Sequence, residues 1–432
     1  MDGKIVLKTK DKYAVSRVLY LLEAAFAYFI DILASGAFLA KLTSEIGISD
    51  SMTAILTSLT SLAGIAQLFS IYLSHKAPYK RFVIPIMLGA ELIYACLYLI
   101  PFLDLSKEAM SLLFFAAMLL AKLLINVISP LKTTWFMNLV PIAERGSYTA
   151  ILQVVSLISG AAVSFGAGYL IDNFQAKGNI SGAFITLSIA ILVFSLSNFF
   201  TLIFSREKEL TKKSEKSKSS DSIKYLSKDK KYKRLLLILL FAAIGNNVIT
   251  PFLGTYQVNE LGFSMTFISI ISVVFSAASM VFVLFFGKLS RNFQHRTILR
   301  IGYPIVFLSY VLNTFTNPEN GTVMFIIYSL VLRVGSAAIA ISSTNLLLEI
   351  TPVEHHATAL SINTVITGVL SFLATLAVSP LVDFMQSRGN TLFGMTVYAQ
   401  QLLSALCAFF YLLLILYYNF VFLSEKKKHD EK

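Results

Sequence analysis

Residues 13–40, YAVSRVLYLLEAAFAYFIDILASGAFLA, set the class of the fold, because they form one apolar run that holds two carboxylates. Between Arg17 and Lys41 the only charged residues are Glu23 and Asp31. A helix needs about 20 apolar residues to cross a bilayer, so this stretch predicts a transmembrane span. Eight helical residues separate the two acids by about 12 Å and about 80°, so both can face one cavity. A carboxylate in hydrocarbon costs at least about 2.5–3.5 kcal/mol, so each acid requires a partner, a proton or a function.

The remainder of the chain has the composition of an integral membrane protein. Of its 432 residues, 56% are hydrophobic and 14% are charged, which excludes an ordinary soluble globular protein. We predict twelve transmembrane helices, at 14–40, 51–74, 82–103, 109–131, 146–171, 180–205, 235–259, 261–287, 297–318, 320–348, 357–382 and 389–424. The predicted domains are a cytoplasmic tail, a six-helix bundle, a basic cytoplasmic linker, a second six-helix bundle and a cytoplasmic tail, at 1–13, 14–204, 205–234, 235–423 and 424–432. No cleavable signal peptide is expected, and a short surface helix can form at Ile223–Leu226 within the linker.

The distribution of basic residues predicts that both termini are cytoplasmic. In that orientation 30 of the 36 Lys and Arg residues fall on the cytoplasmic side, two of them at 132–145, although span 4 is expected to run past Pro130 toward Trp135. Four fall outside, and Lys122 and Arg333 lie within spans. This bias follows the positive-inside rule, so the net charge of +12 reflects topology and not nucleic-acid binding. The two cysteines and five histidines form no metal-ligand or disulfide pattern.

The second half of the sequence repeats the first. EIGIS at 45–49 recurs as ELGFS at 260–264, an offset of 215 residues. Further along the offset becomes 211, which aligns Lys122 with Arg333 and Asp172 with Asp383. Two six-helix halves in parallel repeat, joined by a basic linker, are typical of secondary transporters.

On these features the chain resembles the major facilitator superfamily over essentially its whole length. In that family the turns after spans 2 and 8 carry a G-x-L-a-D-r-x-G-r/k-r/k motif, and the corresponding segments here read YLSHKAPYKR (72–81) and GKLSRNFQHR (287–296). The motif aspartate is replaced by Lys76 in the first copy and by Arg291 in the second. The resemblance implies an all-α membrane fold of twelve helices in two pseudo-twofold halves, with gating turns that contain Lys80, Arg81, Gly287 and Arg296.

Two further motifs of the family are matched in part. The span-4 arginine motif corresponds to Lys122 and to the segment that begins at Arg333 in span 10. The span-5 antiporter motif, G-x-x-x-G-P-x-x-G, is matched without its proline by Gly160, Ser164, Phe165 and Gly168.

The repeat also relates the polar residues inside the spans. The offset of 215 sets Asn246 at the position of Asp31, so spans 1, 4, 7 and 10 carry Asp31 with Asn246 and Lys122 with Arg333. The resemblance implies that these four helices line a central cavity. We predict that Asp31 pairs with Lys122, because each charge offsets the burial of the other. This pair is either a switch, opened by a proton or an anion, or a static salt bridge that fixes helix register.

The other charged residues leave alternatives open. Glu23 either assists Asp31 in proton coupling or is simply hydrated near the cytoplasmic end of its span. Glu91 is interpreted as a packing residue. Arg333 is interpreted as a ligand for a substrate carboxylate or phosphate, unless Glu23 or Glu349 neutralises it. Further candidate substrate ligands are Asn246, Asn247, Asn126, Tyr28 and Tyr256, and the Pro251–Gly254 segment is expected to bend the seventh span.

These residues predict a secondary transporter that moves a small organic solute across the cell membrane by alternating access, driven by a proton gradient. No nucleotide-binding motif occurs, and no cofactor or enzymatic activity is expected. The expected partners are a small-molecule substrate, protons and the lipid bilayer, with no nucleic acid, and the protein is expected to be a monomer. Two alternatives stay open for the substrate: an anionic solute taken up by symport, or an amphipathic cation or drug exported by proton antiport. A transporter-like sensor that binds solute without moving it is a further alternative.

Overall fold

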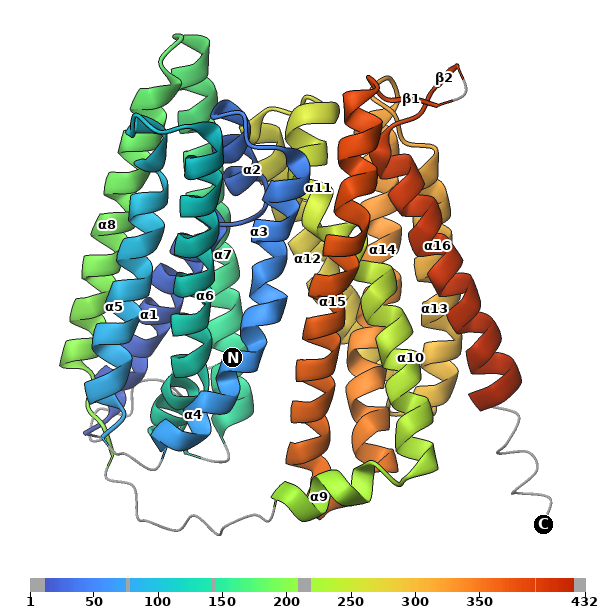
Figure 1. Ribbon diagram of the computed structural model, residues 1–432. Coiled ribbons are helices and arrows are strands. Elements are labelled where there is room, and N and C mark those ends of the chain that lie inside the picture. Colours follow the sequence, from blue (N-terminus) through green and yellow to red (C-terminus); the bar gives the residue numbers. More distant parts are fainter. Residues whose placement is uncertain (1–11, 75–77, 142–143, 209–218, 393, 423–432) are drawn as a thin grey trace. The chain divides into compact units, whose positions relative to one another are not determined.

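The computed structural model describes residues 12–74, 78–141, 144–208, 219–392 and 394–422. The expected N-terminal tail (apart from its last two residues), Lys76, the centre of the linker at 209–218 and the C-terminal tail at 424–432 lie outside the described residues. The chain divides into two compact units, one formed by Met1–Lys213 with Phe263–Ile270 and the other by Ser214–Gly262 with Ile271–Lys432. In each unit, long helices run side by side as a bundle (Figure 1).

The first unit contains the helices of the N-terminal half. They are α1 (Ala14–Leu33), α2 (Gly36–Glu45), α3 (Asp50–Ala63), α4 (Gln67–Ser74), α5 (Lys80–Leu97), α6 (Lys107–Met137), α7 (Arg145–Ala176) and α8 (Ile180–Phe204), with short 3-10 turns at Gly64–Ala66 and Ile100–Phe102. Helix α1 packs against α7 and α8, and α5 packs between α6 and α8. The predicted single span at 14–40 is interrupted between α1 and α2, where Gly36 has a φ of +53° that disfavours other residues.

The second unit contains the helices of the C-terminal half and a small hairpin. Its elements are α9 (Ser219–Leu226), α10 (Lys230–Asn247), a 3-10 turn (Thr250–Phe252), α11 (Leu253–Thr255), a π-helical turn (Tyr256–Glu260), α13 (His295–Thr314), α14 (Gly321–Ile350), a 3-10 turn (Val353–His355), α15 (His356–Ser387), strands β1 (Thr391–Leu392) and β2 (Met395–Thr396), α16 (Ala399–Tyr417) and a π-helical turn (Tyr418–Phe422). The two strands pair antiparallel. Helix α12 (Met265–Leu289) begins in the first unit and continues in the second.

Among the described residues, ten helices are long and apolar enough to cross a membrane. Two more helices, α5 and α13, occupy the expected third and ninth spans, but they are more polar and have only 18 and 20 residues. The protein is therefore a multi-pass membrane protein, and the count of twelve spans stays a prediction. At Pro251–Gly254, where a bend is expected, the regular helix is interrupted: the seventh span changes there from α10 through a 3-10 turn to a π-helical turn.

The two copies of the repeated pentapeptide have the same local structure. Gly47 and Gly262 both have a positive φ, of +74° and +63°. Two residues later, the Ser49 hydroxyl accepts a hydrogen bond from Met52 N–H and the Ser264 hydroxyl accepts one from Phe267 N–H, each at 3.2 Å. The recurring glycine and serine thus supply a left-handed turn and an N-cap at the start of a helix.

An aromatic stack forms the core of the first unit near the beginning of α1. The Tyr20 ring lies 4.0 Å from that of Phe136, and Phe136 in turn stacks on Trp135 at 4.5 Å. The Tyr148 hydroxyl donates to the carbonyl of Arg17, at the first turn of α1. This packing joins α1, α6 and α7 around the first turns of α1, close to the more N-terminal of its two acids.

Candidate functional site

The first unit contains two ion pairs between α1 and α6. Lys122 Nζ lies 2.9 Å from Asp31 Oδ1, which brings together the two residues expected to pair. The Lys122 side chain is only 6% exposed, whereas that of Asp31 is 54% exposed. The lysine ammonium also lies 5.4 Å from the centre of the Tyr94 ring. The buried lysine therefore depends on the carboxylate for its counter-charge, while the carboxylate remains accessible.

The second ion pair was not expected. Lys132 Nζ lies 2.6 Å from Glu23 Oε1, and Glu23 is fully buried. Lys132 lies within α6, which continues past Pro130 to Met137. The hydrated alternative for Glu23 is excluded by its burial, and Glu23 is not the counter-ion of Arg333.

The spacing along the two helices contained a signal for this second pair. The two acids on α1 are eight residues apart, and the two lysines on α6 are ten apart. From Glu23 to Asp31 the side chain turns by about +80° around α1. From Lys132 to Lys122, followed in the same direction along an antiparallel helix, it turns by about −80°, so Asp31 and Lys122 point to the same side of the two helices. If Glu23 and Lys132 meet between the helices, Asp31 and Lys122 then converge on one face.

Asn126 and Tyr28 lie close in sequence to Lys122 and Asp31. Asn126 is half-buried and Tyr28 is exposed. Asn126 Nδ2 donates to the carbonyl of Lys122 at 2.9 Å, and its Oδ1 accepts from Gln67 Nε2 at 3.1 Å. The Tyr28 ring covers Gly160, where a Cβ atom would overlap the ring. Glycine at 160 is thus required for the position of the Tyr28 ring.

In the second unit, Arg333 on α14 has no acidic partner among the described residues. Its Nε is buried and has no hydrogen-bond partner there. It interacts electrostatically with Tyr310 on α13 and with Tyr328 on α14. Glu349, the other acid considered as its counter-ion, lies instead 3.9 Å from Arg296.

Asn246 on α10 is held by two tyrosines of the same unit. The hydroxyls of Tyr310 and Tyr411 both donate to its Oδ1, at 2.8 and 3.0 Å. Because two donors occupy the oxygen, the amide orientation is determined by the network, and Asn246 offers only its N–H groups to other partners.

Two other candidate ligands are engaged within the second unit. Asn247 Nδ2 donates to the carbonyl of Ala243, one turn earlier in α10. Tyr256 is buried, with its hydroxyl 3.4 Å from the carbonyl of Thr316. Tyr256 thus packs inside the bundle, whereas Asn247 is half-buried, and a ligand role for either residue stays a prediction.

The residues of the expected gating turns have different environments. Lys80 Nζ donates to the carbonyls of Ile203 and Ser205, at the end of α8. The Glu207 carboxylate accepts from the backbone N–H groups of Tyr79 and Lys80, at 2.6 and 3.1 Å. Lysine and glutamate thus cap the ends of two neighbouring helices reciprocally, a contact that the sequence motif did not predict.

The remaining turn residues lie at helix ends. Arg81 is exposed in the first turn of α5, and Gly287 lies in the last turn of α12. The Arg296 guanidinium lies 5.7 Å from the centre of the Phe422 ring. A gating role for any of them stays a prediction.

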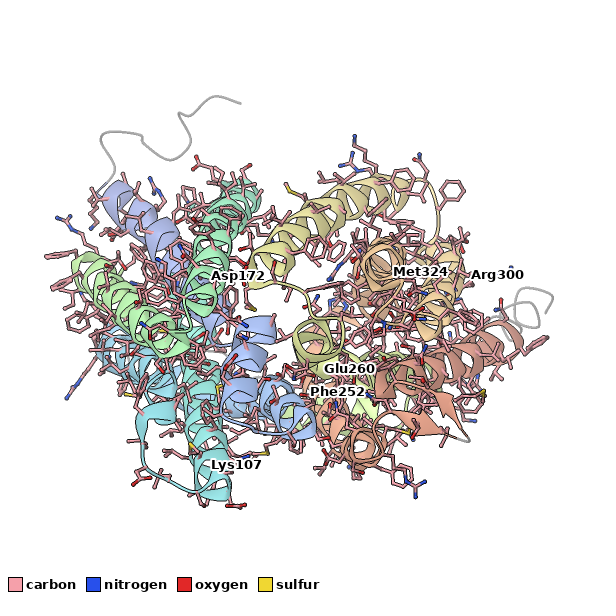
Figure 2. The ribbon with its side chains drawn as sticks, turned by 90° about the horizontal axis from the view of Figure 1, so that it is seen from above. Lys107, Asp172, Phe252, Glu260, Arg300 and Met324 are labelled. Atoms are coloured by element: carbon pink, nitrogen blue, oxygen red, sulfur yellow. The ribbon has the colours of Figure 1, made fainter. Side chains whose placement is uncertain are left out.

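The matched span-5 residues lie where α7 meets the start of α12. The Asp172 carboxylate accepts from Met265 N–H and Thr266 N–H, at 2.9 and 2.8 Å (Figure 2). A Cβ atom on Gly168 would lie 2.6 Å from the carbonyl oxygen of Met265. The Ser269 hydroxyl donates to the carbonyl of Ser164 at 2.8 Å. The role of Asp172 as a helix cap could not be predicted, because it requires knowledge of which helix begins beside it.

Comparison with known proteins identifies the family. The sequence profile of the Major Facilitator Superfamily matches residues 21–375. A search of curated proteins gives no match. The fold is similar to that of the nucleoside transporter NupG (14% identity, TM-score 0.68, covering 94% of this chain and 97% of that one). It is also similar to a D-xylose-proton symporter (14% identity, TM-score 0.66, covering 93% and 97%).

A third similar structure is a bacterial homolog of the human lysosomal transporter Spinster, with 11% identity, a TM-score of 0.63 and coverage of 94% of this chain and 95% of that one. At these identities the solved structures establish the fold alone. The profile match extends over most of the chain, from the middle of α1 into α15. The chain therefore belongs to the major facilitator superfamily of transporters.

Proposed function

We propose that this protein is a proton-coupled secondary transporter of a small anionic organic solute, one that carries a carboxylate or phosphate group. In this proposal twelve helices form two six-helix halves that expose the substrate alternately to the two sides of the cell membrane, with both termini in the cytoplasm. Arg333 and Asn246 bind the anionic group. Asp31 carries the coupled proton, and Lys122 is its ion-pair partner.

The observation that carries this proposal is the arrangement of charges around Arg333. Each of the three acids inside the predicted spans of the first unit has another partner: Asp31 pairs with Lys122, Glu23 pairs with Lys132, and Glu91 accepts from Asn198. Of the bases that lie within spans in the described part of the chain, Arg333 is left without a carboxylate. A guanidinium whose Nε is buried and unpaired is best satisfied by an anionic ligand, to which it can donate a forked pair of hydrogen bonds.

The neighbours of Arg333 favour the same class of substrate. The Asn246 oxygen already accepts from two tyrosines, so its free groups are donors. A guanidinium and amide hydrogen-bond donors together suit carboxylate or phosphate oxygens and oppose a cationic drug. This favours an anionic solute over the amphipathic cation that the two acids of α1 alone left open.

The Asp31–Lys122 pair supports coupling to protons. Asp31 is more than half exposed, so a proton can reach it, whereas Lys122 is buried and remains charged. Protonation of Asp31 removes the counter-ion of a buried ammonium, which changes the stability of the α1–α6 contact. A conformational change can thus be linked to proton binding.

The test uses purified protein in liposomes and a panel of monocarboxylates, dicarboxylates, organic phosphates, zwitterions and organic cations. Losing charge-assisted hydrogen bonds worth about 1.5–3 kcal/mol predicts that Arg333→Gln weakens anion binding about 10- to 100-fold. Arg333→Lys retains the charge but not the planar fork, so an intermediate loss is expected. Arg300→Gln, at an exposed arginine near the start of α13, is the matched control and should bind normally.

Unchanged anion binding by Arg333→Gln would overturn the assigned substrate class. Transport of an organic cation by the wild type, with protons moving in the opposite direction, would replace symport with antiport. Binding of a solute without any flux would favour the sensor alternative.

A further inference from the structure

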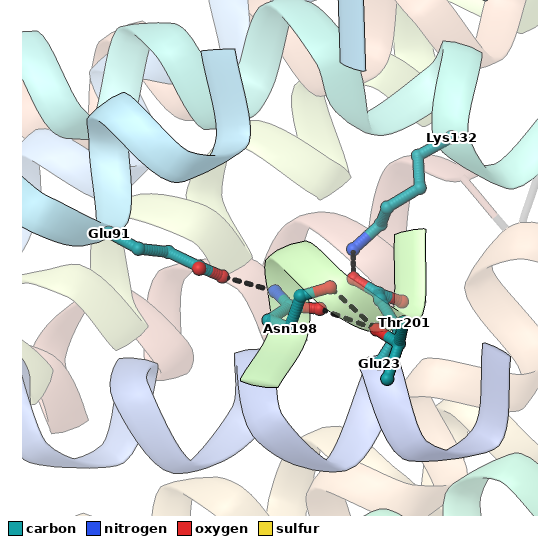
Figure 3. Close-up of polar contacts among 5 residues, drawn as sticks. All are labelled: Glu23, Glu91, Lys132, Asn198 and Thr201. Atoms are coloured by element: carbon teal, nitrogen blue, oxygen red, sulfur yellow. Dashed lines mark hydrogen bonds and ion pairs between the residues drawn. The ribbon is translucent and has the colours of Figure 1, made fainter. Parts of the chain in front are cut away.

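The interior of the first unit contains a second group of charged and polar side chains, separate from the Asp31–Lys122 pair. It consists of Glu23 on α1, Glu91 on α5, Lys132 on α6 and Asn198 on α8, and we refer to it as the Glu91 cluster. Figure 3 shows the carboxyl of Glu91 directed at Asn198 and the ammonium of Lys132 directed at Glu23. Four helices therefore contribute one polar side chain each to a buried site.

The contacts of this cluster are specific. Asn198 Nδ2 donates to Glu91 Oε1, and Lys132 Nζ donates to Glu23 Oε1 at 2.6 Å. The Thr201 hydroxyl donates to the carbonyl of Asn198 at 2.6 Å, and lies 3.4 Å from its side-chain oxygen. Glu91 is 2% exposed, and both Glu23 and Asn198 are 0% exposed.

The cluster lacks one positive charge. It contains two carboxyls and one ammonium, and the Oε2 atoms of both Glu23 and Glu91 are buried without a hydrogen-bond partner among the described residues. An ionised carboxylate buried without a cation is far more costly than a neutral carboxylic acid. The missing charge must be supplied by a bound ligand of charge +1, and the smallest is a proton.

We infer that Glu91 is a proton-binding residue, which holds one proton on Oε2 inside the first helix bundle. Glu23 has an ammonium at 2.6 Å, whereas the hydrogen-bond partner of Glu91 is a neutral amide, so the proton is assigned to Glu91. The carbonyl oxygen of the neutral acid, Oε1, accepts from Asn198, which positions it. The titratable groups that interact with Glu91 are Glu23 on α1, Lys132 on α6 and Tyr94 on its own helix, while the neighbouring groups on α8 do not titrate.

A bound sodium ion is the competing ligand, and the contacts oppose it. A hard cation requires several oxygen ligands. Here an N–H group of Asn198 is directed at Glu91, and an ammonium already occupies one oxygen of Glu23. Sodium binding would require the amide to turn over and the lysine to withdraw.

The consequence for transport rests on the proposed function. When Glu91 loses its proton to solvent, a second carboxylate competes with Glu23 for Lys132. The same two helices, α1 and α6, carry the Asp31–Lys122 pair at positions eight and ten residues away from Glu23 and Lys132. The charge state of Glu91 is thereby connected to the contact that is proposed to switch during transport.

The experiment is infrared difference spectroscopy of the purified full-length protein during a pH titration. The wild type is expected to show the C=O stretch of a buried, protonated carboxyl at pH 7, and this band is expected to disappear at high pH. Glu91→Gln, which has nearly the same shape as the protonated acid, should lack the band, whereas Asp31→Asn should retain it. Asn198→Ala removes the donor to Oε1, so it should retain the band at a higher frequency.

A Glu91→Gln variant that keeps the band would overturn the inference, and so would an Asn198→Ala spectrum identical to that of the wild type. If Glu91→Gln does not fold, the frequency shift in Asn198→Ala is sufficient to decide the assignment. Loss of the band on replacing choline chloride with sodium chloride at constant pH would assign the site to sodium instead. No substrate is needed, so absence of transport in liposomes would refute the proposed function without affecting this result.

Discussion

At the scale of single residues, the three acids inside the first unit are stabilised in three different ways. Asp31 has a lysine and partial exposure, Glu23 has a lysine and complete burial, and Glu91 has a neutral amide. These environments assign different properties to residues of the same chemical type. An accessible, paired acid can exchange a proton rapidly, whereas a buried ion pair is suited to holding two helices together.

Replacing Asp31 with Asn is expected to separate binding from energy coupling. The amide still occupies the position beside Lys122, but it can neither carry a proton nor neutralise the ammonium. Binding of solute and its exchange across the membrane should persist, while accumulation driven by a proton gradient should be lost. Both are measured in liposomes with and without an imposed pH gradient. Uphill transport at the wild-type rate would remove Asp31 from the mechanism.

Replacing Lys132 with Met is expected to destabilise the protein strongly. The change leaves Glu23 buried without its counter-ion, and breaking a buried pair in this way costs about 3–5 kcal/mol. The double variant Glu23→Gln/Lys132→Met should recover most of that loss, because neither charge remains. The free energies of unfolding in mixed detergent micelles give the coupling energy of the pair. If the loss in the double variant equals the sum of the losses in Glu23→Gln and in Lys132→Met, the contact contributes little.

At the scale of elements, the close contact between α7 and the start of α12 depends on the absence of a side chain at Gly168. Asp172 caps the first turn of α12, and Gly168 lets the backbones approach. In the second unit the packing of α13 against α14 has the same basis, since a Cβ atom on Gly335 would lie 2.5 Å from the Val306 side chain. Small residues at such contacts are typical of helix packing in membranes.

Two glycines of α7 give a matched test of this contact. In Gly168→Ala the new methyl group would meet the backbone oxygen of Met265 at 2.6 Å, so the start of α12 must move. Overpacking of this kind costs about 1–3 kcal/mol. At Gly166 a methyl group would have open space around it within 4 Å in the described part of the chain, so Gly166→Ala should be neutral or should stabilise the helix by up to about 1 kcal/mol. Equal unfolding free energies for the two variants would contradict the contact.

At the scale of the whole molecule, charge and hydropathy predict how the chain crosses the membrane. The linker and the turns at one end of the helices hold most of the 36 basic residues, and that side is predicted to be cytoplasmic. Fold-level similarity to other superfamily transporters covers more than nine-tenths of the chain. The orientation is a property of these flanking charges and not of the fold.

Cysteine labelling in intact cells tests the orientation. Cys96 and Cys407 are first replaced by Ala. A single cysteine at Lys228, exposed after α9, should react with a membrane-impermeant maleimide only after permeabilisation. One at Lys177, exposed after α7, should react in intact cells. The opposite pattern at both positions would invert the predicted topology.

The class of protein, its family, the approximate limits of most helices and the pairing of Asp31 with Lys122 could all be predicted from the order of the residues. These follow from apolar runs, the repeat and charges spaced along a helix, which are properties of the chain that need no knowledge of neighbours. The same reasoning showed that Arg333 required a partner. It could not show whether Glu23 satisfied that requirement, because the order of the residues does not show which side chains of neighbouring helices face Glu23.

The three-dimensional packing decided the other contacts between side chains of different helices. The packing of α6 against α1 showed that Lys132 is the partner of Glu23, and that contact removed one of the two acids considered for Arg333. Asn198 met Glu91 through packing between helices that are distant in sequence. The physical reason is that the burial of a charge depends on every helix around it, whereas the tendency to form a helix in a membrane depends on one segment alone.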